Sequence, residues 1–388
     1  MTNFLIRLFI KDYTKISDPK IRIKYGNFAS IIGIVCNFIL CIVKMIIGIL
    51  FNSVAIVADS VNNLTDAATS AITLIGFVFS GKPADKDHPY GHARYEYIAC
   101  LLVSFIILML GLSLLKTSFI KIFKPESITS NYITLIVLII AILFKLWLSF
   151  FYKKIGKTIN SNVLIANYVD SLNDVISTSV VLITTIVAMF TNLNLDGIAG
   201  CFVSLLIIWS GIGILKDTFD DLIGTTPEPE LINNIISKLK SYEDVMGIHD
   251  LVVHSYGPGN YFATVHVEVS SRADILVSHD MIDNIERDFI SDLGINLVIH
   301  LDPIVTDDSE TNEVKEIVSN IVKAINKEIS IHDFRVVKCE THTNLIFDVL
   351  APVDYKQKDD DLIKAINDEV KKHNNNYNVI ITVDKSYI

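Results

Sequence analysis

The sequence is poor in charged residues for its length. Of 388 residues, 20% are charged and 51% are hydrophobic, whereas a soluble domain usually carries about 25% charged residues. The five cysteines form no CxxC pair, and glycine and proline (17 and 9 residues) are too few for a collagen-like chain. These shortages exclude disulfide-scaffold, collagen-like and disordered classes. Because no nucleophile–base pair or phosphate-binding loop stands out either, the sequence does not indicate an enzyme.

The charge that is present is divided unevenly along the chain. Residues 1–226 hold 18 Lys and Arg against 14 Asp and Glu, a balance of +4, and residues 227–388 hold 15 against 29, a balance of −14. We therefore predict a membrane domain over residues 1–226, followed by a soluble acidic tail. An acidic tail argues against nucleic acid as a partner, because phosphate binding requires basic residues.

Six apolar stretches are long enough to cross a bilayer, which requires about 20 residues per helix. They lie near 28–50, 54–80, 97–119, 131–152, 163–190 and 196–216. We predict an all-α, six-helix transmembrane domain surrounded by membrane lipid. The basic N-terminal segment and two basic loops place both termini in the cytoplasm of a cell-membrane protein. Lys116, Lys121 and Lys124 argue against this orientation, because they would then face outside.

Acidic and amide residues recur inside the second and fifth stretches. Asp59 and Asn63 are four residues apart, as are Asp170 and Asp174, so each pair shares one helix face. A carboxylate near mid-membrane costs at least about 2.5–3.5 kcal/mol, so it indicates an ion path or a paired site. Four oxygen-bearing side chains on two helices could surround a divalent cation. The alternative is hydrogen bonding between helices, which suits five further residues of these stretches: Ser60, Asn62, Thr65, Asn167 and Asn173.

Two lysines also fall inside the stretches, whereas histidine does not. Lys44 and Lys145 lie in the first and fourth stretches, where we expect them to snorkel or to pair and not to take part in transport. All ten histidines lie at positions 88 and 92 or from 249 onward. A metal site inside the stretches would therefore have no imidazole ligand.

Three motifs in this order resemble the cation diffusion facilitator family: VADSVNNLTDA in the second stretch, KPADKDHPYGHARYEY after it, and ANYVDSLND in the fifth. The likeness extends from about residue 25 to about residue 304. The resemblance implies a homodimeric six-helix transporter that exchanges a divalent cation for protons. It also implies that the transport site consists of Asp59, Asn63, Asp170 and Asp174.

The transported metal follows from the donor atoms. Zinc transporters of the family typically have histidine at the position of Asp170. Imidazole favours zinc, whereas carboxylate and amide oxygens suit harder cations such as Mn²⁺. This set resembles the manganese branch of the family, so we predict proton-coupled Mn²⁺ efflux, with Fe²⁺ next and Zn²⁺ or Cd²⁺ after it. A metal-sensing receptor or a channel without coupled transport is an alternative of a different class.

The loop after the second stretch contains a second candidate metal site. Asp85, His88 and His92 combine two histidines four residues apart with a carboxylate, and the family has an interfacial site here. The alternative is a solvated loop. Arg94 matches a basic residue that pairs, in the family, with an acidic residue near the end of the sixth helix and locks the dimer. The candidate partners here are Asp220 and Asp221.

From residue 227 the pattern is that of a soluble α+β domain. Residues 227–305 predict the order αββαβ, with a helix near 230–241, strands near 249–255 and 261–269, a helix near 279–291 and a strand near 296–301. The resemblance implies a cytoplasmic, metallochaperone-like domain that binds Zn²⁺ or Mn²⁺ and contributes to the dimer. Its expected ligands are His249, His266, His279, His300 and Asp302.

Residues 306–388 repeat this pattern about 82 residues later. IHDFRVV at 331–337 echoes IHDLVVH at 248–254, and VIITVD ending at Asp384 echoes LVIHLD ending at Asp302. We predict a second αββαβ copy, with elements near 312–327, 331–338, 344–350, 359–373 and 378–384. Asp348 and Thr382 replace two of the ligand histidines. We therefore expect the copy to have lost tight metal binding and to serve packing, dimerisation or weak regulation, with three histidines that are not ligands: His332, His342 and His373.

Overall fold

The computed structural model describes residues 2–16, 18–50, 54–123, 132–191, 196–305 and 308–386; a few side chains within these ranges, including that of Asp59, are not described. The chain divides into two compact units. The first comprises Met1–Thr225 with Ser255–Asn260, and the second comprises Thr226–His254 with Tyr261–Ile388.

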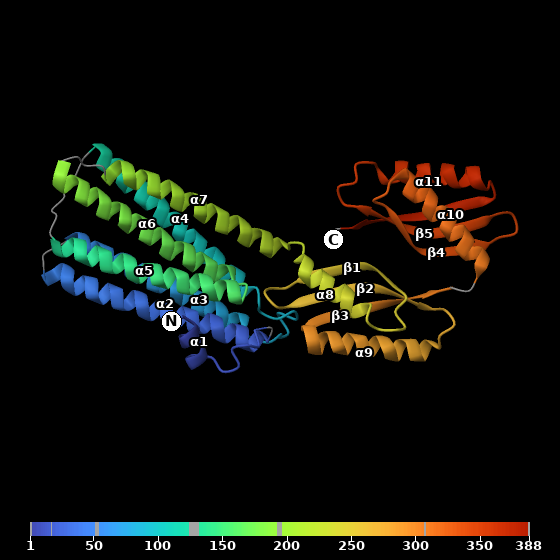
Figure 1. Ribbon diagram of the computed structural model, residues 1–388, viewed down its shortest axis with the longest axis horizontal. Helices are drawn as coiled ribbons and strands as arrows, with labels where there is room; N and C mark the ends of the chain where they lie inside the picture. The colour runs from blue at the N-terminus through green and yellow to red at the C-terminus, as the bar shows by residue number, and fades with distance from the viewer. Residues whose placement is uncertain are drawn as a thin grey trace. The chain divides into compact units, whose positions relative to one another are not determined.

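The first unit is built from long helices (Figure 1). After the short α1 (Thr2–Phe9), six helices follow the predicted stretches: α2 (Pro19–Leu50), α3 (Val54–Ser80), α4 (Tyr95–Phe123), α5 (Tyr132–Thr158), α6 (Asn162–Thr191) and α7 (Asp196–Ile223). In the described part of the chain, four of them, α2, α4, α5 and α7, are long and apolar enough to cross a membrane. The other two, α3 and α6, carry the predicted pairs of polar residues, Asp59 with Asn63 and Asp170 with Asp174.

The helices associate in pairs and pack closely. Contacts are most extensive between α2 and α3, between α4 and α7, and between α5 and α6. A Cβ atom added to Gly26 would overlap the ring of Phe77, and one added to Gly33 would overlap the hydroxyl of Tyr152. Small residues at such crossings let two helix backbones approach, as is usual in membrane bundles.

A buried ion pair ties three parts of this unit together. The guanidinium of Arg22 on α2 donates to both carboxylate oxygens of Glu96 on α4, at 2.7 and 3.0 Å. Arg22 also donates to the carbonyl of Ile159, and the hydroxyl of Ser161 donates to Glu96. The pair joins α2 and α4 to the α5–α6 connection, and it was not predicted from the sequence.

The first part of the second unit has the predicted αββαβ order. Its elements are α8 (Pro229–Leu239), β1 (Gly247–Ser255), β2 (Tyr261–Ser270), α9 (Ile275–Leu293) and β3 (Ile295–Ile304), and the sheet order is β1-β2-β3. Alternate residues of β2 point to the core, where Val265 and Val267 pack with Ile285 and Phe289 of α9. The residues between them, including His266, therefore point to the opposite face of the sheet.

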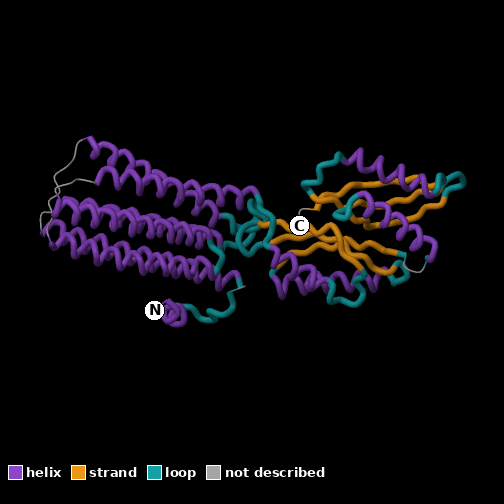
Figure 2. The backbone as a smooth tube through the Cα atoms, turned by 45° about the horizontal axis from the view of Figure 1, so that its top comes forward, coloured by secondary structure: helices purple, strands orange, loops and turns teal. Residues whose placement is uncertain are grey.

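The second part repeats this arrangement. Its elements are α10 (Ser309–Ile325), β4 (Ser330–Lys338), β5 (Thr343–Pro352), α11 (Asp359–His373) and β6 (Tyr377–Ser386), with sheet order β4-β5-β6. The parallel pairing of β5 with β6 starts at Thr343 and Tyr377, each 82 residues after the start of the β2–β3 pairing at Tyr261 and Ile295. Helices cover one face of each sheet (Figures 1 and 2). The predicted second copy is thus present as a fold, and its origin by duplication stays a prediction.

Candidate metal centres

Three of the four predicted transport residues can be placed in the helical unit. Asn63 on α3 is 2% exposed, and its Oδ1 has no hydrogen-bond partner among the residues that the structure describes. Asp170 on α6 is 8% exposed, and Asp174 lies one turn further along the same helix. Asp59 belongs to α3, but its side chain lies outside the described residues. A buried amide oxygen that accepts no hydrogen bond is rare and fits a cation ligand.

A lysine lies among these acids. Nζ of Lys145 on α5 is 2.6 Å from Oδ2 of Asp66 on α3 and 2.7 Å from Oδ2 of Asp174 on α6. The side chains of Lys145 and Asp66 are 4% and 6% exposed, so the ammonium offsets carboxylate charge that burial would otherwise make costly. The expected pairing of Lys145 is therefore confirmed. We call five residues of this helical unit the intrahelical group: Asn63 and Asp66 on α3, Lys145 on α5, and Asp170 and Asp174 on α6.

Asp66 was not predicted to belong to the site. The spacing could have indicated it, because Asp66 follows Asp59 by seven residues and Asn63 by three. All three residues therefore lie on one helix face. Asn167 behaves as the alternative interpretation expected: its amide donates to Oγ1 of Thr73 at 2.9 Å and joins α6 to α3.

The loop between α3 and α4 brings together its three predicted ligands. Oδ1 of Asp85 is 3.3 Å from Nδ1 of His88, and Oδ2 is 3.4 Å from Nε2 of His92. The backbone N–H of His88 donates to Asp85 and is the main reason that the pKa of this carboxyl is lowered. Nδ1 of His92 lies 3.0 Å from the carbonyl of Pro83, which favours a tautomer with Nε2 available to a metal. We call these three residues the loop group.

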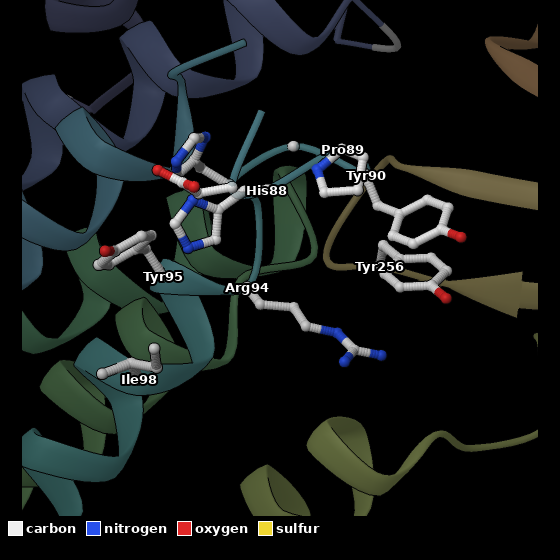
Figure 3. Close-up of a pocket in the computed structure, with 10 residues that line it drawn as sticks. His88, Pro89, Tyr90, Arg94, Tyr95, Ile98 and Tyr256 are labelled. Atoms are coloured by element: carbon white, nitrogen blue, oxygen red, sulfur yellow. The ribbon is translucent and has the colours of Figure 1, made fainter. Parts of the chain in front are cut away.

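A cavity of about 320 Å³ adjoins the loop group and is shown in Figure 3. The rings of Tyr90 and Tyr256, which both line it, stack on each other with their centroids 4.3 Å apart, and the guanidinium of Arg94 lies over Tyr256 at 4.8 Å. Arg94 donates to the carbonyl of Ser255 at 3.1 Å.

The predicted interlock of Arg94 with Asp220 or Asp221, which would lock the dimer, stays a prediction. Asp221 accepts a hydrogen bond from Nδ2 of Asn162. Arg94 immediately precedes α4, where the carbonyl of Ser255 and an aromatic face lie within its reach. Asp220 and Asp221 lie at the end of α7, and no contact that the structure describes joins either of them to Arg94.

Four of the five predicted tail ligands lie together on the helix-free face of the first sheet. Asp302 is central: its Oδ2 is 2.9 Å from Nδ1 of His266 and 3.2 Å from Nε2 of His249, and its Oδ1 is 3.3 Å from Nε2 of His300. His266 and His300 are register partners on β2 and β3, which explains why they are adjacent. We call these four residues the first tail group. The fifth, His279, lies on α9 with a 73% exposed side chain beside Asp283, and the structure does not bring it into the group.

The second copy contains a group of its own. Ligand atoms of His332, Asp348 and Asp384 lie within 4.8 Å of one another. We call these three residues the second tail group. The pKa of Asp384 is raised, first by burial and then by the charges of Asp250 and Asp348. His332 was expected not to be a metal ligand, but it lies among potential ligands. The other two histidines lie elsewhere: His342 is beside Thr341, and His373 ends α11.

Two family models match the chain. The family model of the cation efflux transmembrane domain matches residues 30–223, and that of the cation efflux protein cytoplasmic domain matches residues 227–304. The chain belongs to the cation diffusion facilitator family. It is a membrane cation efflux protein, and its second tail copy, after residue 304, lies outside both matches.

Several curated proteins are similar over most of their length. An uncharacterized transporter of Methanocaldococcus jannaschii is 30% identical over 67% of this chain and 95% of its own length. The manganese efflux system protein MneS of Bacillus subtilis is 30% identical over 73% of this chain and 97% of its own length. The cation-efflux pump FieF of Serratia proteamaculans is 24% identical over 68% and 88%. Such relatives support the family and include manganese exporters.

Proposed function

We propose that this protein exports Mn²⁺ from the cell in exchange for protons. The observation that carries the proposal is the buried amide oxygen of Asn63, which accepts no hydrogen bond from any described residue and belongs to a group whose other ligands are carboxylates. None of residues 93–248 is histidine. An all-oxygen donor set suits Mn²⁺ better than Zn²⁺, and the similarity to MneS agrees with this choice.

In the proposed mechanism, Lys145 and the metal alternate as the cation of the intrahelical group. Without metal, the ammonium holds Asp66 and Asp174 together, as its distances of 2.6 and 2.7 Å indicate. When Mn²⁺ enters from the cytoplasm, it competes with the ammonium for Asp174 and is also bound by Asn63, Asp170 and Asp59. When the site faces outside, protons compete for the carboxylates and the metal leaves, because proton and metal binding are mutually exclusive at a carboxylate.

The same proposal covers the assembly and the membrane. We propose six crossings, because Lys145 lowers the cost of placing the acids of α3 and α6 in the bilayer. Both termini lie in the cytoplasm, the membrane is the cell membrane, and the protein is a homodimer, as the match to the family's cytoplasmic domain supports. The loop group and the first tail group are proposed as further divalent-cation sites.

Transport into proteoliposomes tests the function. The purified protein is reconstituted, and uptake of Mn²⁺, Fe²⁺ and Zn²⁺ is measured with and without an imposed pH gradient. We expect Mn²⁺ flux to be fastest and to depend on the gradient. Flux of Zn²⁺ or Fe²⁺ but not Mn²⁺ would favour the other transporters of the family. Mn²⁺ binding with no coupled flux would favour the sensor or channel.

A further inference from the structure

The second tail group is assembled by strand register, not by chance proximity on the surface. His332 on β4 is the register partner of Asp348 on β5. Asp348 is in turn the partner of Thr382 on β6, and Asp384 lies two residues further along β6 and so on the same face. Phe347 and Val349 on either side of Asp348 are fully buried among the helices, which directs Asp348 to the opposite face.

The backbone directs His249 and His332 in the same way. Each is followed by an aspartate with positive φ, 51° at Asp250 and 48° at Asp333. Such values are uncommon for residues other than glycine. The β4–β5 register shifts between His332 and Arg335, where this aspartate lies. The contacts also correspond, because Nε2 of His249 is 3.2 Å from Oδ2 of Asp302 and Nε2 of His332 is 3.3 Å from Oδ2 of Asp384.

The imidazole of His332 is buried and directed into the group. His332 is 8% exposed, and its Nε2 is 3.3 Å from Asp384 and 3.5 Å from Oδ2 of Asp250. Neither contact has hydrogen-bond geometry, so within the described ranges this buried nitrogen has no hydrogen-bond partner. Leaving a polar atom buried without a partner costs about 1–3 kcal/mol. A metal ion that accepts the lone pair of this nitrogen would remove that cost.

We propose that His332, Asp348 and Asp384 bind a divalent cation, with Asp250 of the first copy as an additional ligand. The rings of His249 and His332 lie 4.4 Å apart, and their residues belong to the two copies. Ligand atoms of His249, Asp250 and His332 are also within 4.8 Å of one another. A cation bound here therefore connects the two tail copies of a single chain.

The donor atoms distinguish this cation from the one expected in the first tail group. The first group offers three imidazoles and one carboxylate, whereas the second offers one imidazole and two carboxylates, or three with Asp250. Carboxylates suit Mn²⁺ and imidazole suits Zn²⁺. The second group thus prefers Mn²⁺ relative to the first, so the tail can respond to the proposed cargo metal even though Asp348 and Thr382 have replaced the histidines.

Counting bound Mn²⁺ tests the site on the full-length protein in detergent. The background carries Asp170→Ala and Asp174→Ala, so that the intrahelical group does not contribute to the count. Bound Mn²⁺ per chain is measured by equilibrium dialysis with elemental analysis, and free Mn²⁺ is measured by electron paramagnetic resonance. We expect His332→Ala and Asp348→Asn each to remove one Mn²⁺ per chain. His373→Ala, on the end of α11, is the matched control and should leave the count unchanged.

A gain of selectivity separates metal binding from folding. Asp348→His gives the second group the donor that His266 supplies to the first, and it should shift the preference of one site from Mn²⁺ toward Zn²⁺ at least about tenfold. A thermal melt without metal shows whether each variant is folded. An unchanged Mn²⁺ count in folded His332→Ala, or an unchanged preference in folded Asp348→His, would overturn the proposal and leave the group as a buried ion pair.

Discussion

The intrahelical group and the first tail group each hold several acidic or metal-binding side chains in a small space. They differ in which groups balance the carboxylate charge. In the helices, Asp66 and Asp174 share the ammonium of Lys145, which is only 4% exposed. In the tail, Asp302 has three imidazoles around it, and His266 and His300 are 37% and 66% exposed. A deeply buried site needs a permanent internal cation, whereas a half-exposed site can rely on solvent and on neutral imidazoles.

Removing a carboxylate from the intrahelical group should have the largest effect. Asp170→Ala is expected to reduce Mn²⁺ transport in proteoliposomes at least about a thousandfold, which corresponds to about 4 kcal/mol. The control is Asn173→Ala on the same helix, whose amide donates to Oγ of Ser210 at 3.4 Å and which should transport at nearly the normal rate. Normal transport by Asp170→Ala would exclude the group as the transport site.

Removing the internal cation tests the difference between the two groups directly. Lys145→Met leaves Asp66 and Asp174 buried without the ammonium, so the metal-free protein should lose about 3 kcal/mol of stability. Mn²⁺ should restore part of it, because the metal supplies the missing positive charge. Thermal unfolding with and without Mn²⁺ measures both effects. The control is Lys153→Met, because Lys153 is also on α5 and its ammonium lies over the ring of Tyr168 on α6.

An equal loss of stability in the presence and absence of Mn²⁺ would contradict this view of Lys145. It would indicate that the lysine fastens α5 to α3 and α6 independently of the metal. The tail provides no equivalent of this experiment, because the partners of Asp302 are histidines.

Metal removal should therefore affect the tail more than the helices. A ligand at 100 times its dissociation constant stabilises the folded state by about 2.7 kcal/mol. On chelation, the strands β1–β3 should lose that protection, while Lys145 partly replaces the metal between α3 and α6. Hydrogen exchange of the full chain, followed by mass spectrometry, compares the two regions. A greater loss of protection in α3 and α6 than in β1–β3 would reverse the comparison.

The sequence predicted what depends on local spacing. The i,i+4 pairs placed Asp59, Asn63, Asp170 and Asp174 on two helices, and the offset of 82 residues predicted every element of the second copy. It did not predict the contact of Lys145 with Asp66, because that contact depends on how α5 packs against α3 and α6.

Two further differences have the same cause. The loop before α4 brings Arg94 to Ser255 and Tyr256, and spacing along the chain did not predict these contacts. Its expected pairing near the end of α7, which would lock the dimer, stays a prediction. His332 was not expected to be a ligand, because Asp348 and Thr382 stand where the first copy has histidines. The IHD motif around His249 is nevertheless retained around His332. Side-chain partners across separate elements follow from tertiary packing, which spacing along the chain does not determine.

The smallest effect is expected at the loop group, which combines features of both sites. His92 is 8% exposed, like an intrahelical residue, whereas Asp85 and His88 are more than half exposed, like tail residues. Because no buried charge is left without a partner, His92→Ala should change Mn²⁺ transport by less than about fivefold, or about 1 kcal/mol. It should nonetheless weaken metal binding at the loop, measured by dialysis in the Asp170→Ala background, with exposed His342→Ala as the control. A loss of transport as large as that of Asp170→Ala would instead place the loop group on the transport path, and burial would then be a poor guide to which of these sites carries the cation.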